Sequence, residues 1–142
     1  MKDVYDLERF LAAQERVYEQ ALAETRRGLK QSHWMWFVFP QIAGLGHSDT
    51  ARRYAVRSLE EANAYLAHLV LGKRLVEIAN ALLTHKTKTA SEIFGHPDDL
   101  KLKSCMTLFH RADGDANPVF KQVLHAFFDG KEDAATLDIL NR

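Results

Sequence analysis

The chain has 142 residues, which suits one domain built around one hydrophobic core. Its 19 basic and 19 acidic residues give a formal net charge of zero, which argues against a general nucleic-acid binder, because such a protein needs a basic face. Its one cysteine, Cys105, excludes an intramolecular disulfide.

The N-terminus and the hydropathy pattern bear on the cellular compartment. The opening sequence MKDVYDLERFLAAQ is charged and lacks the apolar core of a signal peptide. No apolar run approaches the ~20 residues needed to span a bilayer. We therefore expect a soluble cytoplasmic protein without a membrane partner.

A long amphipathic helix is predicted over residues 6–30. Gln14 falls on its apolar face, where a leucine would be expected. A buried glutamine must find partners for its amide or lose roughly 1–3 kcal/mol. Gln14 therefore either bonds a neighbouring loop, which we favour, or points into a binding pocket. The apolar residues of this face are Leu7, Phe10, Leu11, Val17, Tyr18, Ala21 and Leu22.

The stretch SHWMWFVFPQIAGLG, residues 32–46, contains no Asp, Glu, Lys or Arg. Six of its first eight residues are aromatic or large and aliphatic, without helical spacing, which predicts an extended segment buried in the core. Pro40 ends the run, and Gly44 and Gly46 allow tight turns or the close approach of a ligand. The stretch is either scaffold, which the base rates for apolar runs favour, or also one wall of a pocket. Its ligand-binding candidates are His33, Trp34, Trp36 and Gln41.

The rest of the chain is predicted to be helical. Ser48, Ser58 and Thr89 stand at helix starts, and the last two are followed three residues later by glutamate in a capping-box pattern. Pro97 and Pro118 fit the first positions of two further helices. Alternating strand patterns are nearly absent, and no linker divides the chain. We therefore predict an all-α fold, a single compact domain over residues 1–142 with about six to eight helices and one extended aromatic segment.

The seven histidines do not form a metal-binding pattern. They stand at positions 33, 47, 68, 85, 96, 110 and 125, and no two have the i, i+3 or i, i+4 spacing that puts two ligands on one helix face. The chain also has no Walker-type phosphate loop and no nucleophile elbow. We expect no metal and no cofactor, and an inert buried thiol at Cys105.

A second group of polar residues lies on the helix predicted over residues 98–110. Lys101 and Ser104 share a face, Thr107 is adjacent, and Asp99 lies in the first turn. These groups are either solvated, which we favour, or they hold an anion or prime a general base.

Four blocks of the sequence resemble an uncharacterised family known as DUF1810: SHWMWFVFPQIAGLG, YLAHLVLGKRL, IFGHPDDLKLKSCMTLF and VLHAFFDGKEDAATLDIL. The resemblance covers nearly the whole chain. The family pattern has a proline where this chain has Leu69 and a serine where it has Cys105, which weakens any role for a thiol. The resemblance implies a small, mainly helical, intracellular bacterial protein and supplies no activity.

A fainter likeness adds an enzyme alternative by analogy. The order of several residues is similar to that in the helical YbiA-like (NADAR) domains, which act on N-glycosidic bonds in nucleotide-related metabolites or ADP-ribose adducts. The acidic and tryptophan-containing motifs of those domains have no clear counterpart here. The residues are Phe10, Ala13-Gln14, Leu71-Gly72, Met106, Phe109 and Asn117-Pro118.

The leading functional hypothesis is a monomer or homodimer that binds a small anionic, nucleotide-like metabolite. The aromatic residues would stack the base, and Lys101 and Arg53 would neutralise phosphate. We expect this site where His33 and Trp36 share a pocket with the start of the helix that contains Lys101, because a helix start favours anions. One alternative is hydrolysis of an N-glycosidic bond, with His33 or Asp99 as acid or base and Lys101 holding the anion. The other is a protein–protein interaction module with an exposed aromatic patch.

Overall fold

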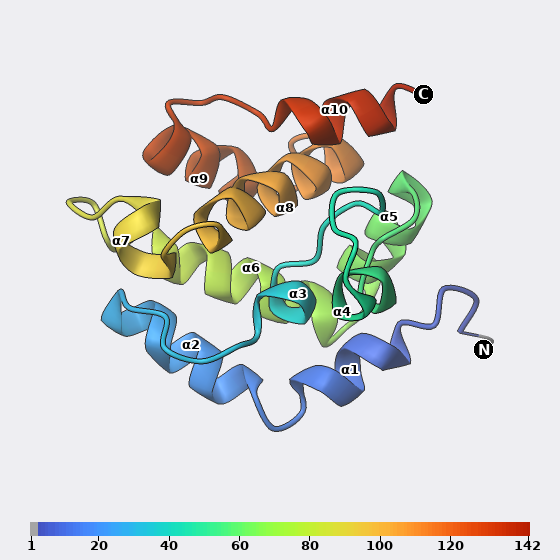
Figure 1. Ribbon diagram of the computed structural model, residues 1–142, viewed down its shortest axis with the longest axis horizontal. Helices are drawn as coiled ribbons and strands as arrows, with labels where there is room; N and C mark the ends of the chain where they lie inside the picture. Colours follow the sequence, from blue (N-terminus) through green and yellow to red (C-terminus); the bar gives the residue numbers. More distant parts are fainter. Residues whose placement is uncertain (1–2) are drawn as a thin grey trace.

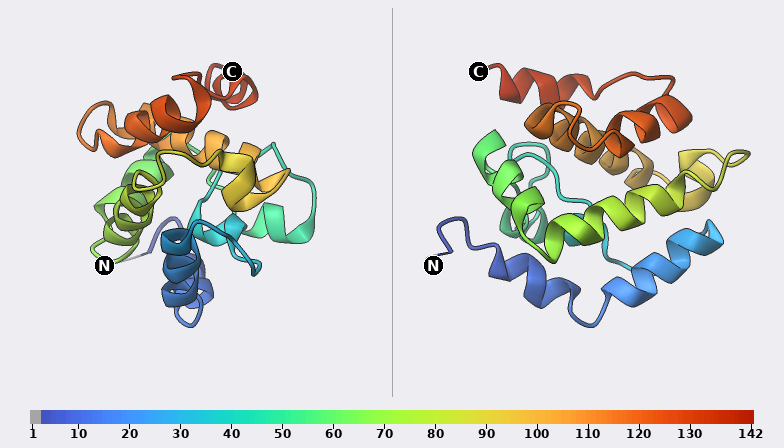
Figure 2. Two further views of the ribbon diagram at one scale, coloured as in Figure 1. Left: turned by 90° about the vertical axis from the view of Figure 1, so that its left-hand side faces the viewer. Right: turned by 180° about the vertical axis from the view of Figure 1, so that it is seen from behind.

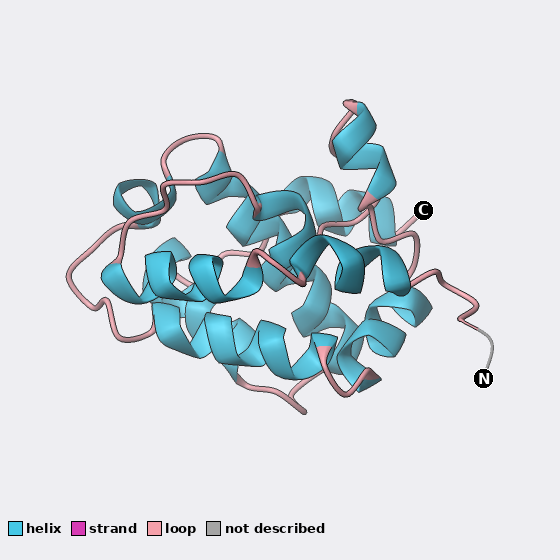
Figure 3. Cartoon of the chain, turned by 90° about the horizontal axis from the view of Figure 1, so that it is seen from below, coloured by secondary structure: helices cyan, strands magenta, loops and turns pink. Residues whose placement is uncertain are grey.

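The computed structural model describes residues 3–142, and within this range the fold contains helices and no strand (Figure 1, Figure 3). The all-α prediction is confirmed, and seven of the ten helices in the described range have at least seven residues. No helix in that range is both long and apolar enough to cross a membrane. The helices are α1 Glu8–Gln14, α2 Tyr18–Arg27, α3 Met35–Val38, α4 Asp49–Arg53, α5 Leu59–Ala67, α6 Leu71–Leu82, α7 Ala90–Phe94, α8 Asp98–Asp113, α9 Val119–Phe128 and α10 Ala134–Leu140.

The two longest helices, α6 and α8, form the centre of the arrangement. Helix α6 lies between α1 and α2 on one side and α8, α9 and α10 on the other (Figure 2). Helix α8 packs against α5, α7, α9 and α10, and its side chains Leu102, Met106 and Phe109 are fully buried. The ring of Phe109 contacts those of Tyr65 and Phe120. Burial of this continuous apolar surface is the main favourable contribution to stability.

The helix predicted over residues 6–30 is instead two helices, α1 and α2, which meet at an angle (Figure 1). A turn between them, in which the backbone N–H of Val17 donates to the carbonyl of Gln14, redirects the chain. The break lets Gln14 and Tyr18 enter the core from separate helices, and the Tyr18 hydroxyl donates to the carbonyl of Arg74 in α6. Tertiary contacts thus override a continuous helical periodicity.

The aromatic stretch is extended only in part. Residues 35–38 form the single helical turn α3, which corrects the expected extended run. The turn places Trp34, Met35 and Val38 in the core and leaves Trp36 partly exposed. A continuous apolar run does not by itself distinguish a buried strand from a buried helical turn, which is why the sequence pattern misled.

Glu24 of α2 fixes the start of the aromatic stretch. Its carboxylate accepts hydrogen bonds of 2.7–3.0 Å from the backbone N–H groups of Gln31 and Ser32, from Ser32 Oγ and from Trp34 Nε1. Burial favours a raised pKa for Glu24, but the hydrogen bonds outweigh burial and lower the pKa to about 2. Glu24 therefore stays ionised and holds Trp34 in place.

A buried ion pair fixes the chain after α4. Arg9 Nη2 lies 2.7 Å from Glu61 Oε2, and both side chains are nearly fully buried. Arg9 also donates to four backbone carbonyl oxygens, two of which belong to Arg53 and Ala55. A guanidinium with this many charge-assisted bonds positions the backbone that accepts them. That backbone borders the cavity described next.

Candidate functional site

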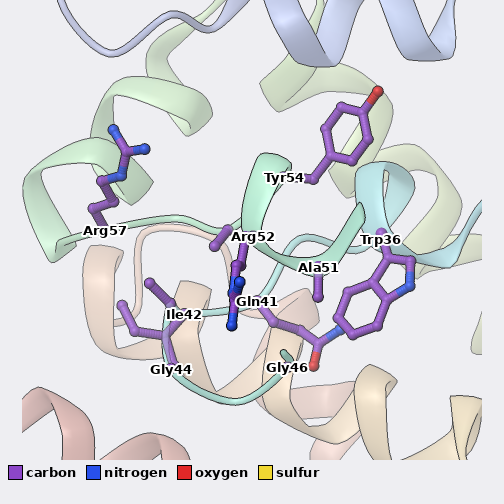
Figure 4. Close-up of a pocket in the computed structure, with 11 residues that line it drawn as sticks. Trp36, Gln41, Ile42, Gly44, Gly46, Ala51, Arg52, Tyr54 and Arg57 are labelled. Carbon is purple, nitrogen blue, oxygen red and sulfur yellow. The ribbon is translucent and has the colours of Figure 1, made fainter. Parts of the chain in front are cut away.

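A cavity of about 220 Å³ lies between the end of the aromatic stretch and α4 (Figure 4). We call it the arginine cavity, because Arg52 and Arg57 line it. Trp36 forms an aromatic wall, and Gln41 supplies an amide. The other residues of the lining are Ile42, Ala43, Gly44, Gly46, Ala51, Tyr54 and Ala55.

One parallel bridge holds the two sides of the arginine cavity together. It pairs Ile42 with Val56. The backbone N–H of Val56 donates to the Gln41 carbonyl at 2.8 Å, and the N–H of Ala43 donates to the Val56 carbonyl at 2.7 Å. These bonds fix the backbone of Gln41, so its side chain enters the cavity from a defined position.

Gly46 allows the loop before α4 to pass close to Trp36. A Cβ atom at this position would lie 2.6 Å from the Cβ of Ala51 and 2.9 Å from Cη2 of Trp36, both shorter than ordinary carbon–carbon contacts. A larger residue would displace the loop or the ring. Gly46 therefore sets the position of the aromatic wall.

Gln41 carries a buried donor that lacks a partner. Only 5% of the residue is exposed, and in the described part of the chain its Nε2 has no hydrogen-bond partner. Figure 4 shows its side chain extending across the cavity toward Trp36 and Gly46. Leaving a buried donor unbonded costs roughly 1–3 kcal/mol. An unbonded donor inside a cavity is therefore expected where a bound ligand supplies the missing acceptor.

The arginine side chains of this region face solvent. Arg52 and Arg57 are exposed, and neither forms an ion pair within the described residues. In the view of Figure 4, Arg52 lies beside Gln41, whereas the guanidinium of Arg57 lies on the opposite side of the cavity. Arg53, the arginine that the sequence predicted to meet phosphate, lines a neighbouring surface pocket and stacks over the ring of Tyr54 at 5.6 Å. These guanidinium groups are available to an anion.

A second cavity, of about 140 Å³, shares Trp36 with the first. We call it the lysine cavity, because Lys30 and Lys101 line it together with His33 and Asp98. The structure thus brings together His33, Trp36 and Lys101, which we expected to share a pocket. Lys101 Nζ lies 4.2 Å from the centroid of a Trp36 ring, at the distance of a cation–π contact.

The lysine cavity is less cationic than the sequence predicted. The Asp98 carboxylate pairs with Lys30 at 2.8 Å and with Lys101 at 2.9 Å. Burial favours a raised pKa for Asp98, but the two lysines outweigh it and lower the pKa. At the start of α8, the backbone N–H groups of Leu100 and Lys101 already donate to the Pro97 carbonyl. These donors are engaged, and Asp98 compensates one of the two lysine charges, so one positive charge remains and the expected anion site at this helix start stays a prediction.

Two predicted binding residues have structural roles. Gln14 is 1% exposed, and its Nε2 donates to the Phe37 carbonyl at 2.7 Å and to the Tyr65 hydroxyl at 3.0 Å. Its Oε1 accepts from Arg74 at 3.3 Å. Gln14 lines neither cavity, in agreement with the interpretation that we favoured. Trp34 borders the lysine cavity, but its indole N–H is bonded to Glu24.

Ser104 and Thr107 lie away from both cavities and anchor the C-terminal helix α10. Ser104 Oγ donates to Asp133 Oδ2 at 3.1 Å, and Thr107 Oγ1 accepts from the backbone N–H of Asp133 at 2.8 Å. Asp133 in turn caps α10 by accepting from the N–H of Thr136. The polar groups that interrupt the apolar face of α8 are therefore explained by helix packing.

The candidate acid–base residues are not assembled into one site. His33 borders the lysine cavity and is exposed, whereas Asp99 lines neither cavity and accepts from His96 at 3.0 Å. Cys105 is fully buried, and burial raises the pKa of its thiol well above the ordinary value. Within residues 3–142, no group of three or more His, Cys, Asp or Glu side chains is arranged to hold a metal ion.

Sequence reasoning missed Arg52 and Arg57 as site residues. A signal was present, because both arginines follow Gly44 and Gly46 within a short segment. Paired glycines let the backbone approach a ligand closely, and the arginines that follow supply positive charge near the same point. Neither arginine belongs to a recognised motif, and the bridge that brings Gln41 opposite them is a tertiary contact.

Comparison with known proteins places the chain in a family. The family DUF1810, described as a protein of unknown function, matches residues 4–140. A search of curated proteins gives no match. The chain is similar to the crystal structure of the conserved hypothetical protein Rv1873 from Mycobacterium tuberculosis, with 50% sequence identity, a TM-score of 0.96 and coverage of 99% of each chain. With a family match over nearly its full length and a relative at this identity, the chain belongs to the DUF1810 family.

Proposed function

We propose that this protein binds a small anionic, nucleotide-like metabolite in the arginine cavity. Arg52 and the Nε2 of Gln41 hold the anionic group, and Trp36 contacts the planar ring. The observation on which the proposal rests is the buried, unpartnered amide of Gln41, which extends into a cavity lined by two arginines without ion-pair partners in the described part of the chain.

The balance of donors and acceptors supports an anionic ligand. The carbonyls of Gln41 and Val56 are engaged in the bridge, and those of Arg53 and Ala55 accept from Arg9. The side chains of this lining include two arginines and one amide and, among the described residues, no carboxylate. A ligand that supplies only acceptors, such as a phosphoryl group, matches this lining better than a hydroxyl-rich neutral sugar.

The lining favours binding over hydrolysis. As far as residues 3–142 are described, it includes no Asp, Glu or His that could act as the acid or base of an N-glycosidase. Asp98, the carboxylate in the lining of the lysine cavity, is paired with two lysines. We therefore favour binding and leave hydrolysis and a protein-interaction role as alternatives.

The test is calorimetric titration with AMP, GMP, CMP and UMP. We expect saturable binding of at least one, and Arg52→Gln should weaken that binding by about tenfold or more. The matched control is Arg16→Gln, because Arg16 is an exposed arginine in the turn between α1 and α2 and lines neither cavity. The control should bind like the wild type. The proposal is wrong if none of the four nucleotides binds saturably, or if Arg52→Gln and Arg16→Gln bind equally well.

A further inference from the structure

A further pocket of about 330 Å³ shares lining residues with the arginine cavity, and we call it the outer pocket. The two share Arg52 and Arg57, and Arg53 lines only the outer pocket. Arg52 and Arg57 thus line both spaces: the arginine cavity, which Gln41 also lines, and the outer pocket, which Gln41 does not line.

The charges of the outer pocket leave a positive excess. Its lining contains four arginines and two aspartates, Asp6 and Asp49. The charge of Arg9 is already compensated by Glu61 at 2.7 Å. Three arginines then face two carboxylates, an excess of one positive charge (3 − 2). This excess attracts a second anionic group to the outer pocket, and the two aspartates reduce the gain in affinity from that group.

The positions of the arginine side chains separate the two spaces. In Figure 4 the guanidinium of Arg57 lies across the cavity from Gln41, with Arg52 between them. Arg53 stacks on Tyr54, and in the described residues it has no carboxylate partner within ion-pair distance. One phosphoryl group that meets Gln41 and Arg52 therefore leaves Arg53 and Arg57 unused.

We infer that the ligand carries two adjacent phosphoryl groups. Arg52 and Gln41 Nε2 hold the inner group in the arginine cavity, and Arg53 and Arg57 hold the outer group in the outer pocket. The ligand class is then a nucleoside diphosphate or a similar diphosphate ester. This inference rests on the proposed function and specifies the class of ligand for the same site.

The experiment compares each nucleoside monophosphate with its diphosphate, by calorimetry at constant ionic strength and without divalent cations. For the wild type we expect the diphosphate to bind about tenfold more tightly than the monophosphate with the same base. Arg53→Gln should reduce this ratio to about one and leave the monophosphate affinity within about twofold, since Arg53 does not line the inner cavity. Arg16→Gln removes the same charge elsewhere, so it should keep the wild-type ratio.

The outcomes distinguish the two proposals. A wild-type ratio near one, or a ratio that Arg53→Gln and Arg16→Gln change equally, overturns the diphosphate inference, and saturable monophosphate binding then leaves the proposed function standing. Absence of saturable binding for both nucleotide classes overturns the proposed function and this inference with it. Thermal unfolding of each variant verifies the fold.

Discussion

Replacing Gln41 by leucine separates the stability of this protein from its proposed binding. Leucine fills a similar volume but has no polar group. The Nε2 donor of Gln41 is unbonded in the described part of the chain, so its removal recovers a desolvation cost of roughly 1–3 kcal/mol. An imperfect fit of the new side chain takes back about 1 kcal/mol. We therefore expect the free energy of unfolding to stay equal or rise by up to about 2 kcal/mol, while nucleotide affinity falls by about tenfold or more.

Gln14→Leu is the matched control, because it makes the same chemical change at an amide that is fully bonded. The substitution leaves the Phe37 carbonyl and the Tyr65 hydroxyl without the amide that donates to them, and it leaves Arg74 without its acceptor. We expect it to lower the free energy of unfolding by about 2–3 kcal/mol. At roughly 2–4 °C per kcal/mol for a chain of this size, a difference of about 2–5 kcal/mol between the two variants corresponds to about 4–20 °C in melting temperature.

The assay combines urea unfolding with calorimetric titration of the same nucleotide. The expected pattern is opposite in sign for the two variants: Gln41→Leu is stable and binds weakly, whereas Gln14→Leu is less stable and, where it remains folded, binds normally. If Gln41→Leu destabilises the protein as much as Gln14→Leu does, the Gln41 amide has a structural partner and the argument for a ligand-binding donor fails.

Three further predictions address the parts that position the site. Glu24→Gln should lower the free energy of unfolding by about 2 kcal/mol near neutral pH, because it replaces charged by neutral hydrogen bonds. The pKa of Glu24 is lowered from 4.5 to about 2, so the stability difference between wild type and Glu24→Gln should have its full size above pH 4.5 and disappear as the pH falls toward 2. A stability difference that does not change in acid would contradict the role of the charge. Gly46→Ala should lower the free energy of unfolding by roughly 1–3 kcal/mol, because the added Cβ meets Ala51 and Trp36. It should also weaken nucleotide binding in titration, and normal binding would show that Trp36 does not form the wall. Thr107→Val should cost about 1–2 kcal/mol in urea unfolding by leaving the N–H of Asp133 unbonded, with unchanged affinity, and a loss of affinity would return Thr107 to the site.

The fold class could be predicted because helix starts and apolar spacing are local properties. Ser58, Thr89 and Asp133 cap α5, α7 and α10 as their side-chain types predict. The break between α1 and α2 could not be predicted, because the apolar residues on both sides of it continue one helical period. Gln14, the last residue of α1, bonds to Phe37 of α3 and Tyr65 of α5, which lie far away in sequence.

The site could be predicted only in part, for a related reason. His33, Trp36 and Lys101 were expected together because an aromatic stretch must be covered by a helix, and the lysine cavity brings them together. The sequence did not reveal that Asp98 pairs with Lys101 and so lowers the charge there. It also did not reveal that Gln41 faces Arg52, because their proximity depends on a single backbone bridge between segments without regular structure.

The arginine cavity lies in the least regular part of the chain, and buried charges hold that part at both ends. Glu24 fixes the chain before α3, and the Arg9–Glu61 pair fixes it after α4. Apolar side chains of similar volume often match or exceed a buried ion pair in stability, so stability alone does not account for this choice. Hydrogen bonds to charged groups are directional, and Arg9 uses them to fix the carbonyls of Arg53 and Ala55. Apolar packing is not directional and would not fix the position of this backbone. The guanidinium groups of α4 would then lose their position relative to Gln41.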